Sequence, residues 1–242
     1  MTNNAAVFDE IVNSRRSIRI YDQESDYDKD IVKRSLERAI LSPNSSNMQL
    51  WEFVRVLSHD KRAELAHYCC DQLAAVTARE LVVFVARPDK YKQSIAHNLS
   101  LVNSPDNFEK EERKEKRRHY YSKLMSVFYA KDFLFIFSLL KKLYVTIGGM
   151  SKPTVREVTS IDKKVTIHKS VGLAAATFMM SVRAEGYDTC PLEGFDSKQV
   201  KKMLGLPRCA QINMIIAVGQ RAADGVFYPR IRYPYSTVVS EL

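Results

Sequence analysis

The sequence predicts an α+β fold in which helices cover both faces of a central sheet. Residues 81–86, Leu-Val-Val-Phe-Val-Ala, form a continuous apolar run of strand length, and residues 211–219 form a second one. Continuous rather than alternating apolar character is typical of a strand that is covered on both faces. Segments with helical periodicity and helix-capping residues precede and follow both runs, so helices are available to cover them.

Length and charge set the first limits on the protein. A chain of 242 residues is long enough for one large domain with its own core. We find no internal repeat or low-complexity linker, so we expect a single domain over 1–242, with an atypical helical insertion at about 90–160. The formal net charge of +9 permits attraction to acidic ligands, phosphate-bearing cofactors, nucleic acid or an anionic membrane surface, but it does not indicate a fold.

The cysteines do not suggest a disulfide framework or a metal site. Cys69, Cys70, Cys190 and Cys209 form no CxxC motif and no metal-like spacing with the five histidines. We therefore expect reduced, buried thiols and no bound metal. The N-terminus lacks a basic segment followed by an apolar one, so we expect no secretory signal peptide and a cytoplasmic protein.

The first elements in chain order are two helices. Residues 5–13 place their apolar side chains near one side of a helix, which Asn3 or Asn4 can cap. Residues 31–41 form a second amphipathic helix. Pro43 ends it, because the residue before a proline is pushed out of the helical region.

A strand, a long helix and a second strand follow. Residues 52–57 are β-branched and aromatic enough for a strand, and Trp51 before them is expected to anchor the core. A capped helix is predicted from Ser58 to about residue 77. The strand at 81–86 comes next.

The region from 90 to 160 is unusual in composition. Residues 109–123 are almost entirely polar or charged, and residues 124–145 are rich in Phe, Leu and Tyr. The strongly apolar run 133–140 is bracketed by lysines and falls far short of the roughly 20 residues that span a bilayer, so we expect no transmembrane segment. We predict a pair of helices that fold over the core or form part of a dimer interface. A lid over a ligand pocket and a segment on a membrane surface remain alternatives.

The C-terminal part contains two further helices, a strand and an arm. Asp162 can cap a long helix that runs to residue 184, and Gly186 is placed to end it. A short helix at 197–204 leads to the strand at 211–219. Residues 225–242 show no helical period, so we expect an extended arm.

A cluster of arginines marks the first candidate site. Arg15, Arg16 and Arg19 lie within five residues, with Ser17 between them. The planar guanidinium matches phosphate oxygens and keeps its charge, so such a cluster can hold a dianionic phosphate. By itself, an arginine cluster after a helix is more often a solvated face or a nucleic-acid contact.

Two further stretches strengthen the phosphate interpretation. They are 42–51, Ser-Pro-Asn-Ser-Ser-Asn-Met-Gln-Leu-Trp, and 186–196, Gly-Tyr-Asp-Thr-Cys-Pro-Leu-Glu-Gly-Phe-Asp. In this order and at these separations, the three stretches resemble the nitroreductase family of FMN-dependent oxidoreductases. The resemblance extends from about residue 8 to 234, and 90–160 departs from it in length and composition.

The resemblance implies a sandwich with a mostly antiparallel sheet, assembled as an intertwined homodimer with FMN at two interfacial sites. It also implies that NADH or NADPH reduces the flavin at N5, after which a small-molecule acceptor such as a nitroaromatic, quinone or activated alkene takes the electrons. The alternatives are a flavoenzyme of the same fold that performs reductive dehalogenation or flavin fragmentation, and a basic module for nucleic acid or membrane surfaces. We expect no nucleic-acid partner, and peripheral membrane contact stays open.

The resemblance assigns cofactor-binding roles to three groups of residues and requires no catalytic side chain, since the cofactor carries the chemistry. The early motif and the C-terminal arm would bind the phosphate side, the 43–49 loop of the partner subunit would contact the ring and ribityl chain, and the 191–194 turn would contact N5 through its main chain. These residues are Arg15, Arg16, Ser17, Arg19, Arg230 and Arg232; Pro43, Asn44, Ser45, Asn47 and Gln49; and Pro191, Leu192, Glu193 and Gly194. The sequence departs from the family pattern at Leu50 and Asn44, and 71–75 lacks a basic residue that some members direct at the flavin.

Overall fold

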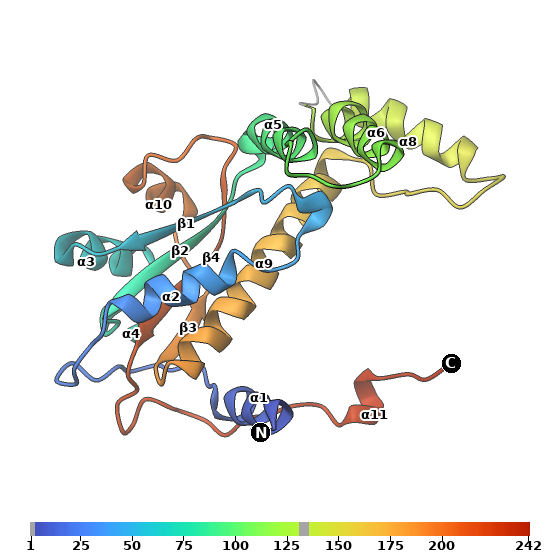
Figure 1. Cartoon of the computed structure of the whole chain (residues 1–242). Coiled ribbons are helices and arrows are strands. Elements are labelled where there is room, and N and C mark those ends of the chain that lie inside the picture. The colour runs from blue at the N-terminus through green and yellow to red at the C-terminus, as the bar shows by residue number, and fades with distance from the viewer. Residues whose placement is uncertain (1–2, 131–135) are drawn as a thin grey trace.

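The computed structural model describes residues 3–130 and 136–242, and a four-stranded sheet lies at its centre (Figure 1). The strands are β1 (Trp51–Val56), β2 (Glu80–Ala86), β3 (Asp188–Leu192) and β4 (Gln211–Gly219), in the spatial order β1-β2-β4-β3. Every pairing is antiparallel, which confirms the predicted sheet. The strand predictions hold within about one residue.

The two central strands carry the register of the sheet. Leu81 of β2 stands opposite Ala217 of β4, and the pairing continues to Phe84 opposite Met214. A β-bulge follows, because Val85 stands opposite Ile212. All seven residues of β2 are buried, as its continuous apolar sequence predicts.

Helices surround the sheet, and the bounds of α1, α2, α9 and α10 lie within about two residues of those predicted. They are α1 (Asn4–Ser14), α2 (Asp30–Ala39), α3 (His59–Tyr68), α4 (Leu73–Val76), α5 (Tyr91–Val102), α6 (Glu111–His119), α7 (Ser126–Tyr129), α8 (Ile136–Gly148), α9 (Ser160–Ala184), α10 (Ser197–Met203) and α11 (Tyr235–Val238), with a π-helical stretch between α6 and α7 (Tyr120–Met125).

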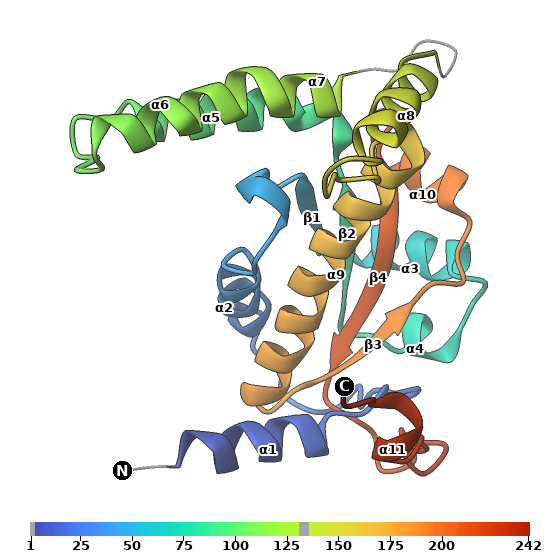
Figure 2. The ribbon, with the colours of Figure 1, turned by 90° about the vertical axis from the view of Figure 1, so that its right-hand side faces the viewer.

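The sheet separates two hydrophobic cores. On one face, α9 and α2 pack over Phe84, whose ring centroid lies 5.3 Å from that of Phe178 on α9. On the other face, α3, α4 and α10 cover Val83 and Ile215. Figure 2 shows α9 running along the sheet, with α3 and α4 on the opposite side. Trp51 belongs to the α9 core, as predicted.

The long helix predicted from Ser58 to residue 77 is wrong in its middle. The structure forms α3 and α4 with a turn between them, in which Cys70 and Asp71 have φ angles of 58° and 51°. Residues in the left-handed region cannot continue a right-handed helix, so the chain reverses there. Helical propensity on both sides gave no sign of this break.

The long helix α9 begins slightly earlier than its predicted cap. Thr159 is the N-cap, and Asp162 occupies the third helical position, where its carboxylate accepts from the Thr159 N–H at 3.0 Å. This reciprocal capping box uses Asp162 in the second role rather than the first. Gly186 follows the helix with a φ of 87°, as its predicted role requires.

The insertion consists of more elements than a pair of helices. Helices α5 to α8 extend beyond the sheet, and Figure 2 shows α5 and α6 projecting to one side. The apolar run 133–140 lies partly outside the described residues. Within the described part of the chain, one helix, α9, is long and apolar enough to cross a membrane; 44% of its most apolar window is buried, and its contacts are those of a core helix.

Two smaller expectations also need correction. The four cysteines are free, but only Cys69 and Cys190 are buried, whereas Cys70 and Cys209 are exposed. The C-terminal arm is extended over most of its length, but it contains the short helix α11 four residues before its end.

Candidate cofactor site

The arginine motif lies along the edge of the sheet beside β3. Ile18 donates its N–H to the Thr189 carbonyl at 3.2 Å, and Ser17 forms a parallel bridge with Thr189. Ile18 and Tyr21 are fully buried, whereas Arg19 between them is exposed. Ile18 and Tyr21 therefore anchor the segment in the core, and Arg19 is turned outward.

The C-terminal arm returns to this motif and closes a cavity of about 240 Å³. The cavity is lined by residues 15–17, 19 and 226–232. Arg16 donates to the Tyr228 carbonyl, and the backbone N–H of Arg19 donates to the Gly225 carbonyl at 2.7 Å. The structure thus brings together the phosphate-side residues predicted from two ends of the chain.

Arg230 has an additional role that the sequence did not reveal. Its Nη2 donates to the carbonyls of Val12, Asn13 and Arg15, at 3.2, 3.1 and 2.5 Å. These carbonyls lie at the C-terminal end of α1, where the helix dipole favours a positive charge. Arg230 therefore caps α1 and also fixes the arm next to Arg15.

The cavity is strongly electropositive. Across residues 3–130 and 136–242, none of Arg15, Arg16, Arg19, Arg230 and Arg232 pairs with a carboxylate. Burial lowers the pKa of Arg15, and the charges of Arg230, Arg232 and Arg16 lower it further. A bound anion would relieve this repulsion, so the donor set fits a phosphate.

Cys190 lies next to these arginines and was not singled out as a site residue. Arg19 Nη1 lies 3.6 Å from its Sγ. Burial raises the pKa of the thiol, against the opposing effect of Arg19 and Arg15. The only signal for Cys190 in the sequence was its position in the 186–196 stretch, directly after Thr189.

A buried carboxylate positions the segment that precedes the motif. Asp188 is almost fully buried and accepts from Arg221 Nε at 2.7 Å and Nη2 at 2.5 Å, and from Arg183 at 3.0 Å. Arg221 also donates to the Ser14 carbonyl at 3.1 Å, at the end of α1. This network connects β3 to the residue before Arg15.

The predicted 191–194 turn is only partly a turn: Pro191 and Leu192 still belong to β3, and the chain leaves the strand at Glu193 and Gly194 and bends at Phe195. Leu192 points into the core, whereas Glu193 and Gly194 are exposed. Within the part of the chain that the structure describes, the N–H groups of Glu193 and Gly194 have no protein acceptor, so they are available to a ligand.

Gln72 fixes this turn from the other side. It stands in the 71–75 stretch that lacks a basic residue, and its Nε2 donates to the Gly194 carbonyl at 2.7 Å. A Cβ on Gly194 would lie 3.3 Å from the same Nε2. The neutral amide of Gln72 therefore orients the turn, from a stretch that has no basic side chain.

The 43–49 loop is not near the arginine cavity of the same chain. It follows α2, whose ten residues span about 15 Å, and Figures 1 and 2 both place it at the end of α2 remote from α1. Asn44 Oδ1 accepts from the Gln49 N–H at 2.9 Å, and Asn47 pairs with Asn98 at 3.0 Å. The loop is ordered by its own chain, with Pro43, Ser45 and Asn47 exposed.

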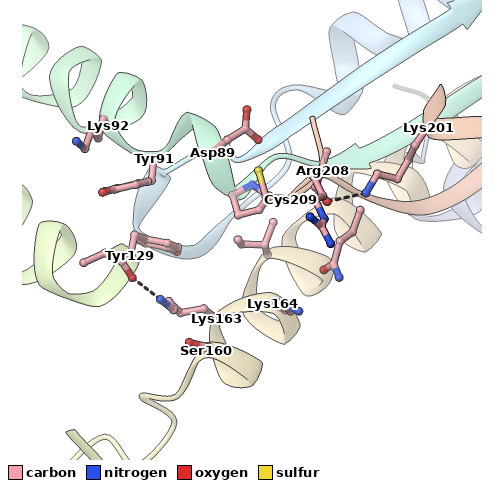
Figure 3. Close-up of a pocket in the computed structure, with 15 residues that line it drawn as sticks. Asp89, Tyr91, Lys92, Tyr129, Ser160, Lys163, Lys164, Lys201, Arg208 and Cys209 are labelled. Carbon is pink, nitrogen blue, oxygen red and sulfur yellow. Dashed lines mark hydrogen bonds between the residues drawn. The ribbon is translucent and has the colours of Figure 1, made fainter. Parts of the chain in front are cut away.

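A larger cavity of about 920 Å³ lies between α5, α7, α9 and the start of β4 (Figure 3). Tyr91 and Tyr129 line one side with nearly parallel rings. Lys163 and Lys201 also line it. Lys163 donates to the Ala130 carbonyl and Lys201 to the Arg208 carbonyl, both at 2.7 Å. None of the site residues predicted from the sequence lines this cavity.

Comparison with known proteins gives a consistent result. The model of the nitroreductase family matches residues 12–220. YdgI of Bacillus subtilis (strain 168), to which the name NAD(P)H nitroreductase is provisionally attached, is 27% identical over 236 residues, covering 96% of this chain and 95% of that protein.

Two solved structures share the fold. A nitroreductase-like protein of Exiguobacterium sibiricum 255-15, crystallised with FMN, has a TM-score of 0.67 at 24% identity and covers 97% of both chains. CLA-ER, an enone reductase of gut-bacterial fatty acid saturation metabolism, has a TM-score of 0.70 at 19% identity and covers 100% of both chains.

Proposed function

Because this chain belongs to the nitroreductase family, we propose that it is an FMN-dependent oxidoreductase that takes electrons from NADH or NADPH. One observation carries the proposal: five arginines from the two ends of the chain surround a single cavity without a carboxylate partner in the described structure. Such a donor set requires an anion, and a terminal phosphate supplies two negative charges. The FMN in the Exiguobacterium structure and the NAD(P)H nitroreductase name of YdgI support the choice of cofactor and donor.

The residues would divide the work of holding FMN. Arg15, Arg19 and Arg232 would bind its phosphate, and Ser17 would add a hydroxyl. The exposed N–H groups of Glu193 and Gly194 would donate to the N5 edge of the ring, with Gln72 holding the turn in place. Backbone amides suit this position, because an amide N–H donates a hydrogen bond without transferring its proton, so it does not react with the hydride.

The remaining part of the site would come from a second chain. The 43–49 loop lies at the end of α2 remote from α1 (Figure 1), too far from the arginine cavity of its own chain, and its residues Pro43, Ser45 and Asn47 are exposed. In the arm, the side chains of Tyr228, Ile231 and Tyr233 are at least three-quarters exposed. Such exposure of large apolar side chains is unfavourable unless another surface covers them. Both features support a homodimer in which each site uses residues of both subunits.

The chemistry follows from the cofactor and not from a side chain. When bound, FMN accepts a hydride from NADH or NADPH and then reduces a second molecule, here proposed to be a nitroaromatic, a quinone or an activated alkene. The enone reductase among the similar structures makes the activated alkene a reasonable first substrate to assay. Product analysis with and without oxygen would distinguish this reaction from reductive dehalogenation or flavin fragmentation.

We also propose that the chain forms a single cytoplasmic domain with α5 to α8 as its helical insertion. The contacts of α5, α7 and α9 around one cavity support one body. Cell fractionation and limited proteolysis would test the two parts of this statement.

The test of the cofactor site is the absorbance spectrum of the purified protein. We expect about one FMN per chain, released as a yellow chromophore on denaturation. Arg15→Ala combined with Arg19→Ala should purify colourless while keeping its folded circular dichroism spectrum. Arg113→Ala combined with Arg118→Ala is the matched control on the exposed helix α6 and should stay yellow.

Either of two results would contradict the proposal. One is a double variant of Arg15 and Arg19 that retains FMN and full activity. The other is an unmodified protein that is colourless and takes up no added FMN.

A further inference from the structure

Helix α8 has a broad apolar surface that no described part of the chain covers. The apolar residues of this surface recur at helical spacing, and the side chain of each is more than half exposed. We call them the α8 apolar face: Leu139, Leu140, Leu143, Tyr144 and Ile147 of the helix, with Met150 in the turn that follows it. At 100° per residue the five helical residues occupy one continuous arc of about 140° of the helix surface.

The opposite side of α8 is fixed to the protein. Val145 is buried, and Ser138 accepts a hydrogen bond from the Ser160 N–H at 3.0 Å, which ties α8 to the start of α9. In Figures 1 and 2, α8 lies at the end of the molecule remote from α1. The α8 apolar face is therefore held outward on a fixed helix.

Positive charge flanks this face on both sides. Lys141 and Lys142 fall on either side of the arc, and Lys141 donates to the Val127 carbonyl at 2.7 Å. Residues 136–164 contain six basic and two acidic side chains, a net charge of +4 within a chain of +9. Nearly half of the net charge thus lies within 29 consecutive residues around the apolar face.

We propose that the α8 apolar face docks on the surface of an anionic lipid bilayer. Large aliphatic and tyrosine side chains enter the boundary between headgroups and acyl chains, and flanking lysines extend to lipid phosphates. A second copy of this chain fits the surface less well, because a symmetric contact would bring Lys141 and Lys142 of both copies together. This inference does not depend on the proposed enzyme activity.

The experiment is co-sedimentation of the intact, purified protein with vesicles. Vesicles of equal parts phosphatidylcholine and phosphatidylglycerol should bind the protein at least about 10-fold more tightly than pure phosphatidylcholine, and added salt should weaken the binding. Leu143→Ser combined with Ile147→Ser should reduce the partition coefficient by about 10-fold or more. Leu57→Ser combined with Leu101→Ser removes two exposed leucines elsewhere and should leave it unchanged.

Each variant is also weighed by analytical ultracentrifugation. An unchanged oligomeric mass together with the loss of vesicle binding supports the proposal. Absence of binding to anionic vesicles by the unmodified protein overturns it. A changed oligomeric mass of the Leu143 and Ile147 variant also overturns it, because the face would then be an interface between protein chains.

Discussion

Replacing Asp188 by Asn should test the link between the buried carboxylate and the candidate cofactor site. The substitution keeps the shape of the side chain and one acceptor oxygen. It removes the negative charge and turns an NH₂ group toward a guanidinium that is already a donor. Of the three charge-assisted hydrogen bonds, from Arg183 and twice from Arg221, at most the two that end on Oδ1 can remain, and they then end on a neutral acceptor.

The size of the effect follows from burial. The Asp188 side chain is 3% exposed, whereas Arg183 and Arg221 are 23% and 35% exposed. Removing one partner of a buried ion pair costs about 3–5 kcal/mol, and the two arginines can regain some hydration. We therefore expect the free energy of unfolding to fall by about 3 kcal/mol. Because Arg221 also holds the Ser14 carbonyl, the segment leading to Arg15 should loosen and FMN should be retained less well.

Urea unfolding followed by circular dichroism measures the loss of stability, and flavin fluorescence measures the retention of FMN. Asp28→Asn is the matched control, because Asp28 pairs with Arg34 at 3.1 Å while both side chains are more than 40% exposed. It should lose less than about 1 kcal/mol. If Asp188→Asn unfolds at the same urea concentration as the unmodified protein, the network does not carry the energy assigned to it.

Three further predictions concern the end of the central strand β4, the core and acid stability. Gly219→Ala would place a Cβ 2.8 Å from the ring of the fully buried Tyr21, so we expect a loss of about 1–3 kcal/mol in urea unfolding; an unchanged midpoint would show that the ring can move. Phe84→Ala opens a cavity in a fully buried position between the sheet and α9 and should cost about 3–5 kcal/mol by the same measurement, whereas a loss below 1 kcal/mol would mean that the core collapses around it. Hydrogen bonds, chiefly from Arg34, lower the pKa of Glu185 to about 2, so the stability it contributes is complete above its ordinary pKa of 4.5 and is lost as pH falls from there toward 2; Glu185→Gln should remove this part of the acid dependence, and an identical acid profile would refute it.

Local features of the fold could be predicted well from the sequence. The strands 81–86 and 211–219 are continuous apolar runs, and the structure buries them at the centre of the sheet. The cap at Asn3 and the terminator at Gly186 act through neighbouring backbone groups, so short sequence patterns identify them. The helix predicted from Ser58 onward failed where two consecutive non-glycine residues adopt positive φ, which no local preference favours.

Part of the candidate site could be predicted from the sequence, and part could not. Arg15, Arg16, Ser17 and Arg19 could be identified as a cluster, because they are adjacent in the chain and their chemistry is that of a phosphate site. Their contact with the arm could be expected only from the resemblance to a family. The pairing of Asp188 with Arg221 and the contact of Cys190 with Arg19 could not be predicted, because these partners are separated by many residues in the chain.

Periodicity, capping and charge act between near neighbours, so the strands, most of the helices and the stretch rich in guanidiniums follow from the amino-acid sequence. That Arg230 caps α1 while facing Arg15, and that the 43–49 loop stands far from the cavity of its own chain, follows from the packing of distant segments. Packing also decides that the apolar side chains of α8 point outward beside lysines. These outcomes depend on how the arm, α2 and the insertion pack against the sheet, and packing joins residues that no local pattern connects.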